Sequence, residues 1–297
     1  MSTTHGTPAT RTTSPAGGQV GARLPVRAPG WLVNLVLAAF GVLMIAPLVW
    51  LIVSSVTGPE TAFGIPPVWI PKPFTWENIE AVPEQIPFWT MFGNSALVAV
   101  LSTGGSLLVS IPAAYAFSRI NFRGRDPLFL LMLAALMVPG QLTVIPVFIL
   151  MRHLGLYDSL GALWIPALIN VFAIFFLRQY FKSIPRELDE AARIDGAGHF
   201  WIMTRMIVPL SAPAISALAI LGFEASWNNY FGPLIFLATP EKMTLPIGLT
   251  TLQGGFGSAP TSIVFAAVAM VVLPILIIFL LFQRYFVASI ATAGFKG

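Results

Sequence analysis

The chain has 297 residues, of which 56% are hydrophobic and only 9% are charged, and its mean hydropathy is +0.82. This composition excludes a soluble globular protein and predicts a helical protein that crosses a membrane several times. The absence of cysteine excludes structural disulfides and thiolate metal sites. The net charge of +4 comes from basic residues at the ends of apolar segments, which does not favour a nucleic-acid surface.

The apolar segments predict six membrane spans behind a polar tail. Residues 1–29 are rich in Thr, Pro, Gly, Ala and Ser and carry three arginines but no acid, which predicts a disordered tail. The next segment, 31–56, is longer than the apolar core of a signal peptide and shows no persuasive cleavage pattern, so we expect an uncleaved first span. The third span contains Pro139-Gly140, which should kink it. The remaining predicted spans cover residues 89–117, 127–151, 160–177, 212–237 and 261–282.

The positive charges orient these spans. If the N-terminus is inside the cell, only Lys72, Arg152 and Lys242 lie outside, and the cytoplasmic segments hold the other thirteen of the 16 Lys and Arg residues. The positive-inside rule therefore predicts that both termini and the loop 184–209 are cytoplasmic.

The loop 184–209 contains the densest run of charge in the chain, I-P-R-E-L-D-E-A-A-R-I-D. Pro185 suits the first turn of a helix, and the three acids that follow are favoured there by the helix dipole. Asp195-Gly196 predicts a helix end and a turn, and a second helix over 197–207 leads to Pro209. A polar loop of this kind between two apolar spans is expected to contact a partner in the aqueous phase.

This loop resembles the coupling loop of ATP-binding-cassette importer permeases, which has the pattern E-A-A-x3-G-x9-I-x-L-P. Glu190-Ala191-Ala192, Gly196 and Pro209 match the pattern, while Met206 and Val208 replace the family's Ile and Leu with other apolar residues. The external segment I-P-P-V-W-I-P-K-P-F-T-W-E-N-I and the ending Q-R-Y-F-V-A-S-I-A-T-A-G-F-K-G are similar to those of carbohydrate importers. The alternative is an ordinary amphipathic loop.

The resemblance implies an all-α type I importer transmembrane domain over residues 30–297, located in the cytoplasmic membrane. It implies a heterodimer with a homologous permease, a cytoplasmic ATPase dimer and an external solute-binding protein. The expected cargo is a sugar or oligosaccharide, moved by alternating access. The residues that it assigns to ATPase coupling are Glu190, Ala191, Ala192, Asp195, Gly196 and Pro209. We expect Glu190 to anchor the loop by hydrogen bonds or an ion pair, and Gly196 to supply a turn that a side chain would obstruct.

The sequence shows no catalytic motif. No lysine follows a glycine, so a phosphate-binding loop is absent, and neither H-E-x-x-H nor G-x-S-x-G occurs. We therefore expect that the chain is not an enzyme and binds no metal or cofactor, and that ATP is used by the partner ATPase subunits.

One acid, Glu224, lies inside a predicted span, where an ionisable residue is costly and marks a candidate functional site. Trp227 and Asn228 follow at i+3 and i+4 and are expected to share its face. With Asn229 they form the predicted translocation-pathway residues, because carboxylate, ring and amides suit a sugar and the W-N pair resembles permeases of the maltose-transporter type. Two alternatives remain: Glu224 pairs with a neighbouring helix, or the protein is a secondary, ion-coupled transporter with Glu224 as its intramembrane site.

Three further polar residues, Asn94, Gln141 and Asn170, lie in or near spans and are expected to form interhelical hydrogen bonds. Gly104-Gly105 is expected to permit close helix packing. The sequence leaves open whether this subunit has a substrate site of its own.

Overall fold

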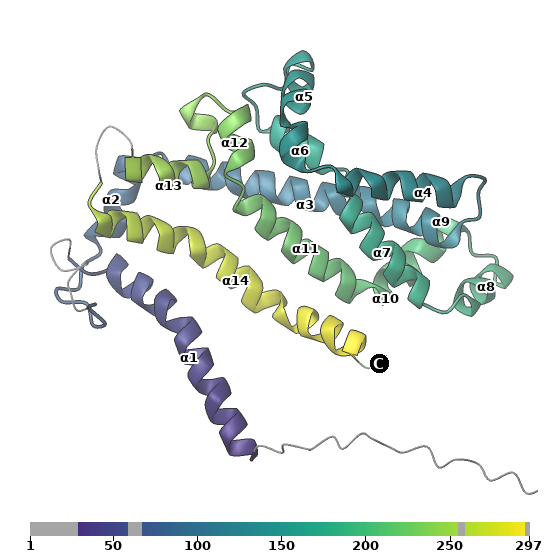
Figure 1. The fold of residues 1–297 in the computed structure, drawn as a ribbon, viewed down its shortest axis with the longest axis horizontal. Helices are drawn as coiled ribbons and strands as arrows, with labels where there is room; N and C mark the ends of the chain where they lie inside the picture. Colours follow the sequence, from purple (N-terminus) through teal and green to yellow (C-terminus); the bar gives the residue numbers. More distant parts are fainter. Residues whose placement is uncertain (1–28, 59–66, 255–258, 295–297) are drawn as a thin grey trace, which may run out of the picture. The chain divides into compact units, whose positions relative to one another are not determined.

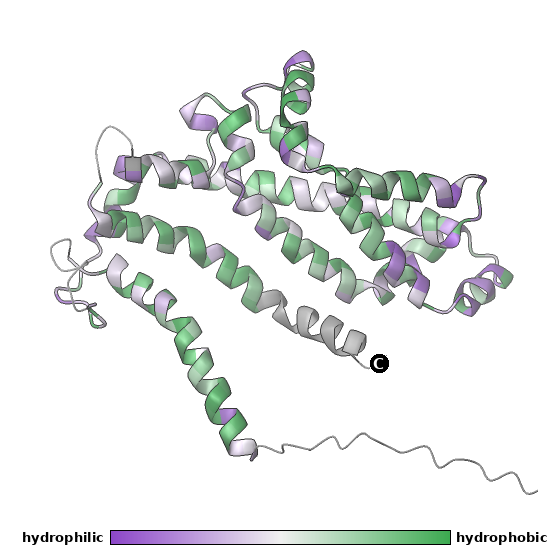
Figure 2. Ribbon diagram, viewed as in Figure 1, coloured by the Kyte–Doolittle hydropathy of each residue, from purple (hydrophilic) through white to green (hydrophobic). Residues whose placement is uncertain are grey.

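The computed structural model describes residues 29–58, 67–254 and 259–294, with side chains described as far as Leu280. Within these residues all regular secondary structure is helical, apart from one isolated bridge between Thr57 and Phe74. Residues 1–28 of the predicted tail 1–29, and the side chains of the C-terminal segment from Gln283, lie outside this description. Figures 1 and 2 show the helices and the strongly apolar character of the longest ones.

The described chain contains up to six membrane spans, in agreement with the number predicted. Two of the six are pairs of helices with a sharp bend between them: Arg125–Met137 with Gly140–His153, at 100°, and His199–Leu210 with Ala212–Trp227, at 77°. The other four are long enough and apolar enough to cross alone: Gly30–Ser55, Phe88–Arg119, Gly161–Ser183 and Thr261–Leu280.

The chain divides at Pro47 into two units, and α1 (Gly30–Ser55) contributes to both. In the second unit, residues 48–297, the long helix α3 (Phe88–Arg119) is central. The helices α7 (Val171–Ser183) and α11 (Ala212–Trp227) pack along it, and α14 (Thr261–Gly294) packs on α11 (Figure 1).

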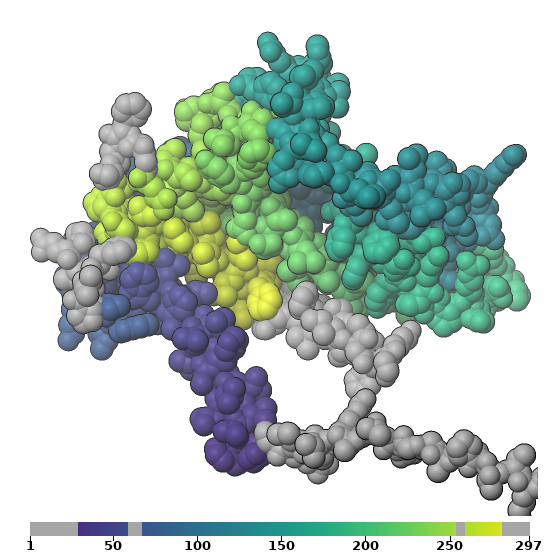
Figure 3. All heavy atoms as spheres, viewed as in Figure 1, coloured from purple at the N-terminus to yellow at the C-terminus, as the bar shows by residue number. Residues whose placement is uncertain are grey.

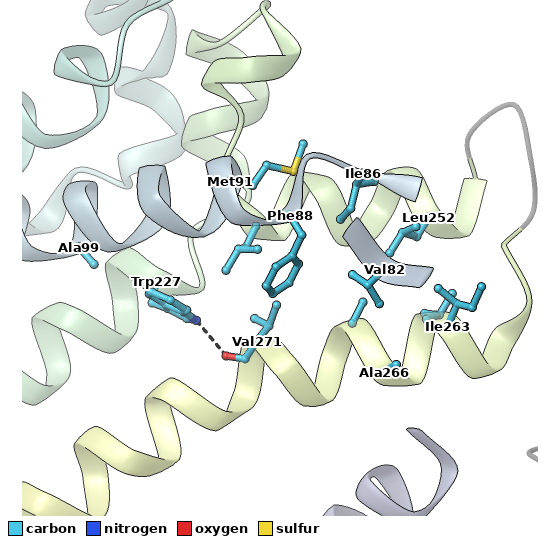
Figure 4. Packing of buried hydrophobic residues seen from close by; sticks show 13 residues of the cluster. Val82, Ile86, Phe88, Met91, Ala99, Trp227, Leu252, Ile263, Ala266 and Val271 are labelled. Atoms are coloured by element: carbon cyan, nitrogen blue, oxygen red, sulfur yellow. Dashed lines mark hydrogen bonds between the residues drawn. The ribbon is translucent and has the colours of Figure 1, made fainter. Parts of the chain in front are cut away.

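Two large apolar cores, and a small third one of Met151, Ala162 and Phe236, hold this unit together. One surrounds Phe88 and Trp227 and includes the short helix α2 (Glu77–Gln85), as Figure 4 shows. The other lies near the opposite end of α3 and includes Leu177 and Phe181 of α7. Both are formed by side chains with almost no exposure, which makes the α3-centred bundle the rigid part of the molecule.

The third span is broken at Pro139-Gly140, as predicted. The helix α4 (Arg125–Ala134) continues as a 3-10 turn over Ala135–Met137, and α5 (Gly140–His153) then leaves at 100°. Proline fixes its own φ and pushes the residue before it out of the helical region, and Val138 is extended at ψ 115. The break therefore follows directly from the sequence.

The fourth span is also interrupted. The helix α6 (Gly161–Ala167) ends before Leu168, and α7 begins at Val171 with Asn170 as its N-cap. The Asn170 Oδ1 accepts a hydrogen bond of 3.0 Å from the Ala173 N–H, so this asparagine caps a helix and is not seen to join two helices. The helix continues to Ser183, six residues beyond the predicted end at 177.

The prediction that the fifth span runs to residue 237 is wrong. The helix α11 ends at Trp227, and a separate short helix α12 (Phe231–Phe236) follows and lies against α6 (Figure 3). Asn229 explains the interruption, because its Oδ1 accepts a hydrogen bond of 3.0 Å from the Gly232 N–H and so forms a turn. A 3-10 turn over Pro240–Lys242 and α13 (Leu245–Gly254) complete this region.

Candidate coupling and translocation sites

The loop 184–209 forms two short helices joined by a turn, as the sequence predicted. The first, α8 (Glu187–Ile194), begins two residues after Pro185, which is therefore outside the helix instead of in its first turn. The second starts with α9 (His199–Ile202) and continues through a π-helical segment and α10 (Val208–Leu210). Pro209 thus lies within this helix, and the bend follows at Ser211.

Gly196 forms the turn between the two helices. Its φ is +86°, and hydrogen bonds run from Gly196 N–H to the Arg193 carbonyl (3.0 Å) and from Ala197 N–H to the Ala192 carbonyl (2.9 Å). This is the Schellman arrangement, in which a left-handed glycine ends a helix. A Cβ at this position would meet nothing within 4 Å. Glycine is therefore needed for the backbone conformation, whereas we had expected that a side chain would be obstructed.

A buried ion pair attaches α8 to the end of α3. Arg119 Nη1 lies 3.2 Å from Asp189 Oδ2, and the two side chains are 1% and 9% exposed. The Arg119 Nη2 also donates to the carbonyls of Phe181 (2.7 Å) and Ile184 (2.8 Å), the last turn of α7. These four residues are called the inner anchor below.

The inner anchor corrects our expectation for Glu190. We expected this acid to anchor the loop, but in the structure Glu190 is exposed, and the neighbouring Asp189 forms the anchor. The sequence did not indicate the pair because Arg119 lies 70 positions earlier in the chain. A weak signal existed: Asp189 and Ala192 are spaced i, i+3, and both face the protein interior.

Two other contacts support the same end of α3. The Arg186 Nη2 donates to the Ser118 carbonyl at 3.3 Å, and the Tyr115 hydroxyl lies 3.2 Å from His199 Nδ1. The loop is therefore held from both of its helices.

Arg178 of α7 contacts the same end of α3 and also contacts α4. Its Nε donates to the Phe117 carbonyl at 3.1 Å, its guanidinium lies 3.8 Å above the Phe129 ring, and its Nη2 is 3.5 Å from Asp126. The ends of α3, α4 and α7 are joined through this one side chain.

The opposite surface of the loop is apolar and unusually exposed. Ile194 is 87% exposed and Phe200 is 76% exposed, and Trp201 lies beside them. Trp201 also lines a groove of about 710 Å³ between α8 and α9, together with Ala191, Asp195 and Gly196. An exposed apolar surface around a groove is typical of a protein–protein contact. We call this surface the coupling surface.

The predicted translocation residues do not share one face. Asn228 Nδ2 donates to Glu224 Oε1 at 2.8 Å on the exposed side of α11, so these two residues are paired as their spacing indicated. Trp227 is only 1% exposed, and its indole Nε1 donates to the Val271 carbonyl at 3.3 Å, as Figure 4 shows. Adjacent residues in a helix, such as Trp227 and Asn228, point 100° apart, and the indole of Trp227 is buried in the apolar core around Phe88. The expectation that this ring stacks on a sugar beside Glu224 is therefore wrong.

Asp158 joins two loops at the end of the bundle remote from the coupling loop. Its Oδ1 accepts from the backbone N–H groups of Ala238 (2.9 Å) and Thr239 (3.0 Å), and its Oδ2 accepts from the Thr239 hydroxyl (2.5 Å) and Lys242 Nζ (2.9 Å). These hydrogen bonds, that of the Thr239 hydroxyl first, hold the pKa of the Asp158 carboxyl well below its ordinary value. Asp158, Thr239 and Lys242 are called the outer clasp below.

The packing prediction for Gly105 is confirmed, whereas Asn94 binds a loop instead of a neighbouring membrane helix. The Asn94 Nδ2 donates to the carbonyls of Glu241 (2.9 Å) and Met243 (3.0 Å), which ties α3 to the loop before α13. A Cβ on Gly105 would lie 2.3 Å from Leu168 Cδ2, so α3 approaches the α6–α7 break closely because this residue has no side chain. Gly104 meets nothing within 4 Å and has no such role in the described chain.

Comparison with known proteins identifies the class. Residues 106–292 match the family described as binding-protein-dependent transport system inner membrane component, and the chain belongs to this family. It is 38% identical to the arabinooligosaccharides transport system permease protein AraQ of Halalkalibacterium halodurans, over 90% of this chain and 96% of AraQ. It is 34% identical to the trehalose/maltose transport system permease protein MalG of Thermococcus litoralis, over 86% and 93% of the two chains.

A solved structure agrees with this assignment. A chain of a bacterial ABC transporter involved in the import of the acidic polysaccharide alginate has a TM-score of 0.75 to this one, at 26% identity, over 86% of this chain and 96% of that chain. The fold is thus that of a type I ATP-binding-cassette importer permease, as the coupling-loop resemblance implied, and the protein is a membrane transport subunit.

Proposed function

We propose that this chain is one of two permeases of an importer that moves a sugar or oligosaccharide across the cytoplasmic membrane, driven by a separate ATPase. The observation that carries the proposal is the coupling surface: Ile194, Phe200 and Trp201 are exposed on a loop whose other side is fixed by a buried ion pair. Apolar side chains held rigidly on a cytoplasmic loop suit a partner protein better than water. The names of AraQ and MalG support a carbohydrate cargo.

The proposed assembly contains a homologous permease, two ATPase subunits and an external solute-binding protein. A solved relative of the same fold, the alginate transporter, was crystallised with a periplasmic protein carrying an alginate pentasaccharide, which supports the last of these partners. We place both termini and the loop 184–209 in the cytoplasm, where the ATPase has access to ATP. No cofactor is assigned to this chain.

The proposed mechanism is alternating access. ATP binding closes the ATPase dimer and moves the docked loop, and the inner anchor carries this movement to α3 and α7. ATP acts through its different affinity for the inward-open and outward-open states. Nothing in the comparisons supports an ion-coupled transporter, and Glu224 is paired with Asn228 on an exposed face.

The experiment is affinity purification of a tagged chain from native membranes in mild detergent, with mass spectrometry of the proteins that remain bound. We expect an ATPase and a second permease in comparable amounts. The variant Gly196→Asp should lose the ATPase and transport but remain in the membrane, because an aspartate at φ +86° disrupts the turn.

Gly198→Asp is the matched control, since Gly198 lies in the same loop at φ −78° and also has no neighbour within 4 Å of an added Cβ. It adds the same charge without the strained backbone. If the unmodified chain is recovered without an ATPase, or Gly196→Asp transports normally, the coupling assignment is wrong.

A further inference from the structure

A second cavity, separate from the coupling surface, lies between α3, α6, α7 and α11, has a volume of about 370 Å³ and is open at one side, where Phe172 and Leu221 are 48% and 49% exposed. Pockets that bind small molecules have volumes of about 300–1,000 Å³. The proposed function gives this cavity no role. Its polar lining residues are Ser102, Thr103, Ser106, Asn170, Ser226 and Asn229.

Two helix breaks meet at the cavity. Asn170 belongs to the break between α6 and α7, and Asn229 to the break between α11 and α12, and both line the cavity. Interrupted backbone within a membrane is tolerated only where it is buried in protein or borders a water-filled cavity. Two independent interruptions at one cavity indicate a polar space within the spans.

The hydrogen bonds of the two asparagines fix the orientation of their amides. Asn170 Oδ1 accepts from Ala173 N–H, and Asn229 Oδ1 accepts from Gly232 N–H. Each carboxamide oxygen is therefore engaged with backbone, and each NH₂ group is left as the available donor. The cavity accordingly has hydrogen-bond donors at two of its edges.

Hydroxyl groups line the wall formed by α3. Ser102 and Ser106 are buried residues, and the Thr103 Oγ1 is buried without a hydrogen-bond partner in the described chain. A buried hydroxyl without a partner is costly unless a ligand or water satisfies it. Opposite this wall, Gly222 also lines the cavity.

The chemistry of the lining selects the kind of ligand. Asp, Glu, Lys and Arg are absent from the residues that line the cavity, and the remaining wall is apolar, with Phe172 and Leu221 among its members. A sugar ring has this combination of neutral hydroxyl groups and apolar C–H faces. We propose that this cavity is a carbohydrate subsite within this permease, which holds one neutral sugar unit of the cargo during transfer. The proposal rests on the proposed function.

The first test uses the absence of cysteine from the chain. Ser106→Cys introduces a single, nearly isosteric thiol into the cavity, and Ser183→Cys, at the exposed end of α7, is the control. The complete importer in proteoliposomes is treated with 2-aminoethyl methanethiosulfonate, with and without saturating arabinotriose or maltose. We expect the sugar that is transported to slow modification of Ser106→Cys several-fold and to leave Ser183→Cys unchanged. Equal rates with and without that sugar overturn the proposal.

The second test measures ATP-dependent uptake. Ser106→Ala and Ser226→Ala should each raise the KM for the transported sugar roughly ten-fold, the effect of losing one hydrogen bond. Ser110→Ala, on the same helix but outside the cavity and fully buried, should leave the KM unchanged. A rise in KM with all three variants, or with none, contradicts the proposal.

The outcomes separate this proposal from the proposed function. Uptake is measured for arabinotriose, maltose, trehalose, diacetylchitobiose and the anionic sn-glycerol 3-phosphate. If none of the sugars is imported, the proposed function fails and the subsite with it. If a sugar is imported but neither protection nor the KM change is seen, only the subsite fails. Import of the anionic compound alone also excludes the subsite, because no charged residue lines the cavity.

Discussion

The inner anchor and the outer clasp both tie loops to the bundle through a carboxylate, but their surroundings are opposite. In the inner anchor the side chains of Arg119 and Asp189 are 1% and 9% exposed, and Arg119 Nε and Asp189 Oδ1 have no partner in the described chain. In the outer clasp Lys242 is 47% exposed, and both oxygens of Asp158 accept hydrogen bonds.

The difference concerns what happens when a contact opens. Water can replace Lys242 at Asp158, so the outer clasp can open and close at small cost. Water cannot reach Arg119 easily, and separating it from Asp189 would leave a buried charge unpaired. We therefore expect the inner anchor to remain intact while the protein changes state, and the outer clasp to open locally.

The largest expected effect is at the inner anchor. Arg119→Met or Asp189→Asn should each reduce the free energy of unfolding by about 3–5 kcal/mol, because one charge remains buried without its partner. The double variant Arg119→Met/Asp189→Asn leaves no unpaired buried charge, so it should lose less stability than the sum of the two single variants. Thermal unfolding of the purified assembly measures all three, and strictly additive losses would show that the two residues do not interact.

The turn between α8 and α9 gives the next effect. Gly196→Ala should destabilise the loop by about 1–2 kcal/mol, since a residue with a Cβ disfavours the left-handed conformation at φ +86°. Gly198→Ala, at φ −78°, is the control and should change stability by much less. Amide hydrogen exchange over residues 187–207 reports the local stability of the loop, and equal effects of the two variants would refute the backbone argument.

A smaller, local effect is expected at the outer clasp. Asp158→Asn keeps a side chain that tolerates the φ of 53° but removes the charge that Lys242 meets. We expect faster amide exchange at Ala238 and Thr239 with little change in the melting temperature. Glu241→Gln makes the same change of charge in the neighbouring turn and should leave this exchange unaffected. Global destabilisation by Asp158→Asn would mean that the outer clasp contributes to the stability of the whole bundle, as the inner anchor does.

The smallest effect concerns pH. Because the folded-state pKa of Asp158 is depressed, its stabilising contribution is present above its unfolded pKa of about 4 and is lost as the pH falls towards the lower folded value. The difference in amide-exchange protection at Ala238 and Thr239 between the natural chain and Asp158→Asn should therefore be constant from about pH 5 to pH 8. It should shrink only below about pH 4. A difference that changes near neutral pH would show that a group other than Asp158 titrates in the outer clasp.

The sequence predicted the features that depend on nearby residues. The bend at Pro139-Gly140, the end of α8 at Gly196 and the number of spans follow from proline geometry, glycine conformation and apolar length. The roles of Asp189 and Trp227 could not be predicted in this way. Asp189 and Glu190 are adjacent acids, and only the position of Arg119 decides which one is buried.

The cavity in the bundle escaped prediction for the same reason. Its lining comes from residues between 98 and 229, and each serine or asparagine taken alone is an ordinary polar residue in a span. Asn229 was predicted beside Glu224, yet the break after α11 brings it to the same cavity as Asn170 instead.

The position of Arg119 also limits how the bundle can move. One guanidinium belongs to α3, pairs with α8 and binds the last carbonyls of α7, so these three helix ends share a fixed point. Two of the places where helical hydrogen bonding is interrupted lie next to Asn170 and Asn229. Both places border the 370 Å³ cavity. We infer that rotation of the coupling loop changes the size of this cavity, because the chain can bend at the two helix breaks that border it.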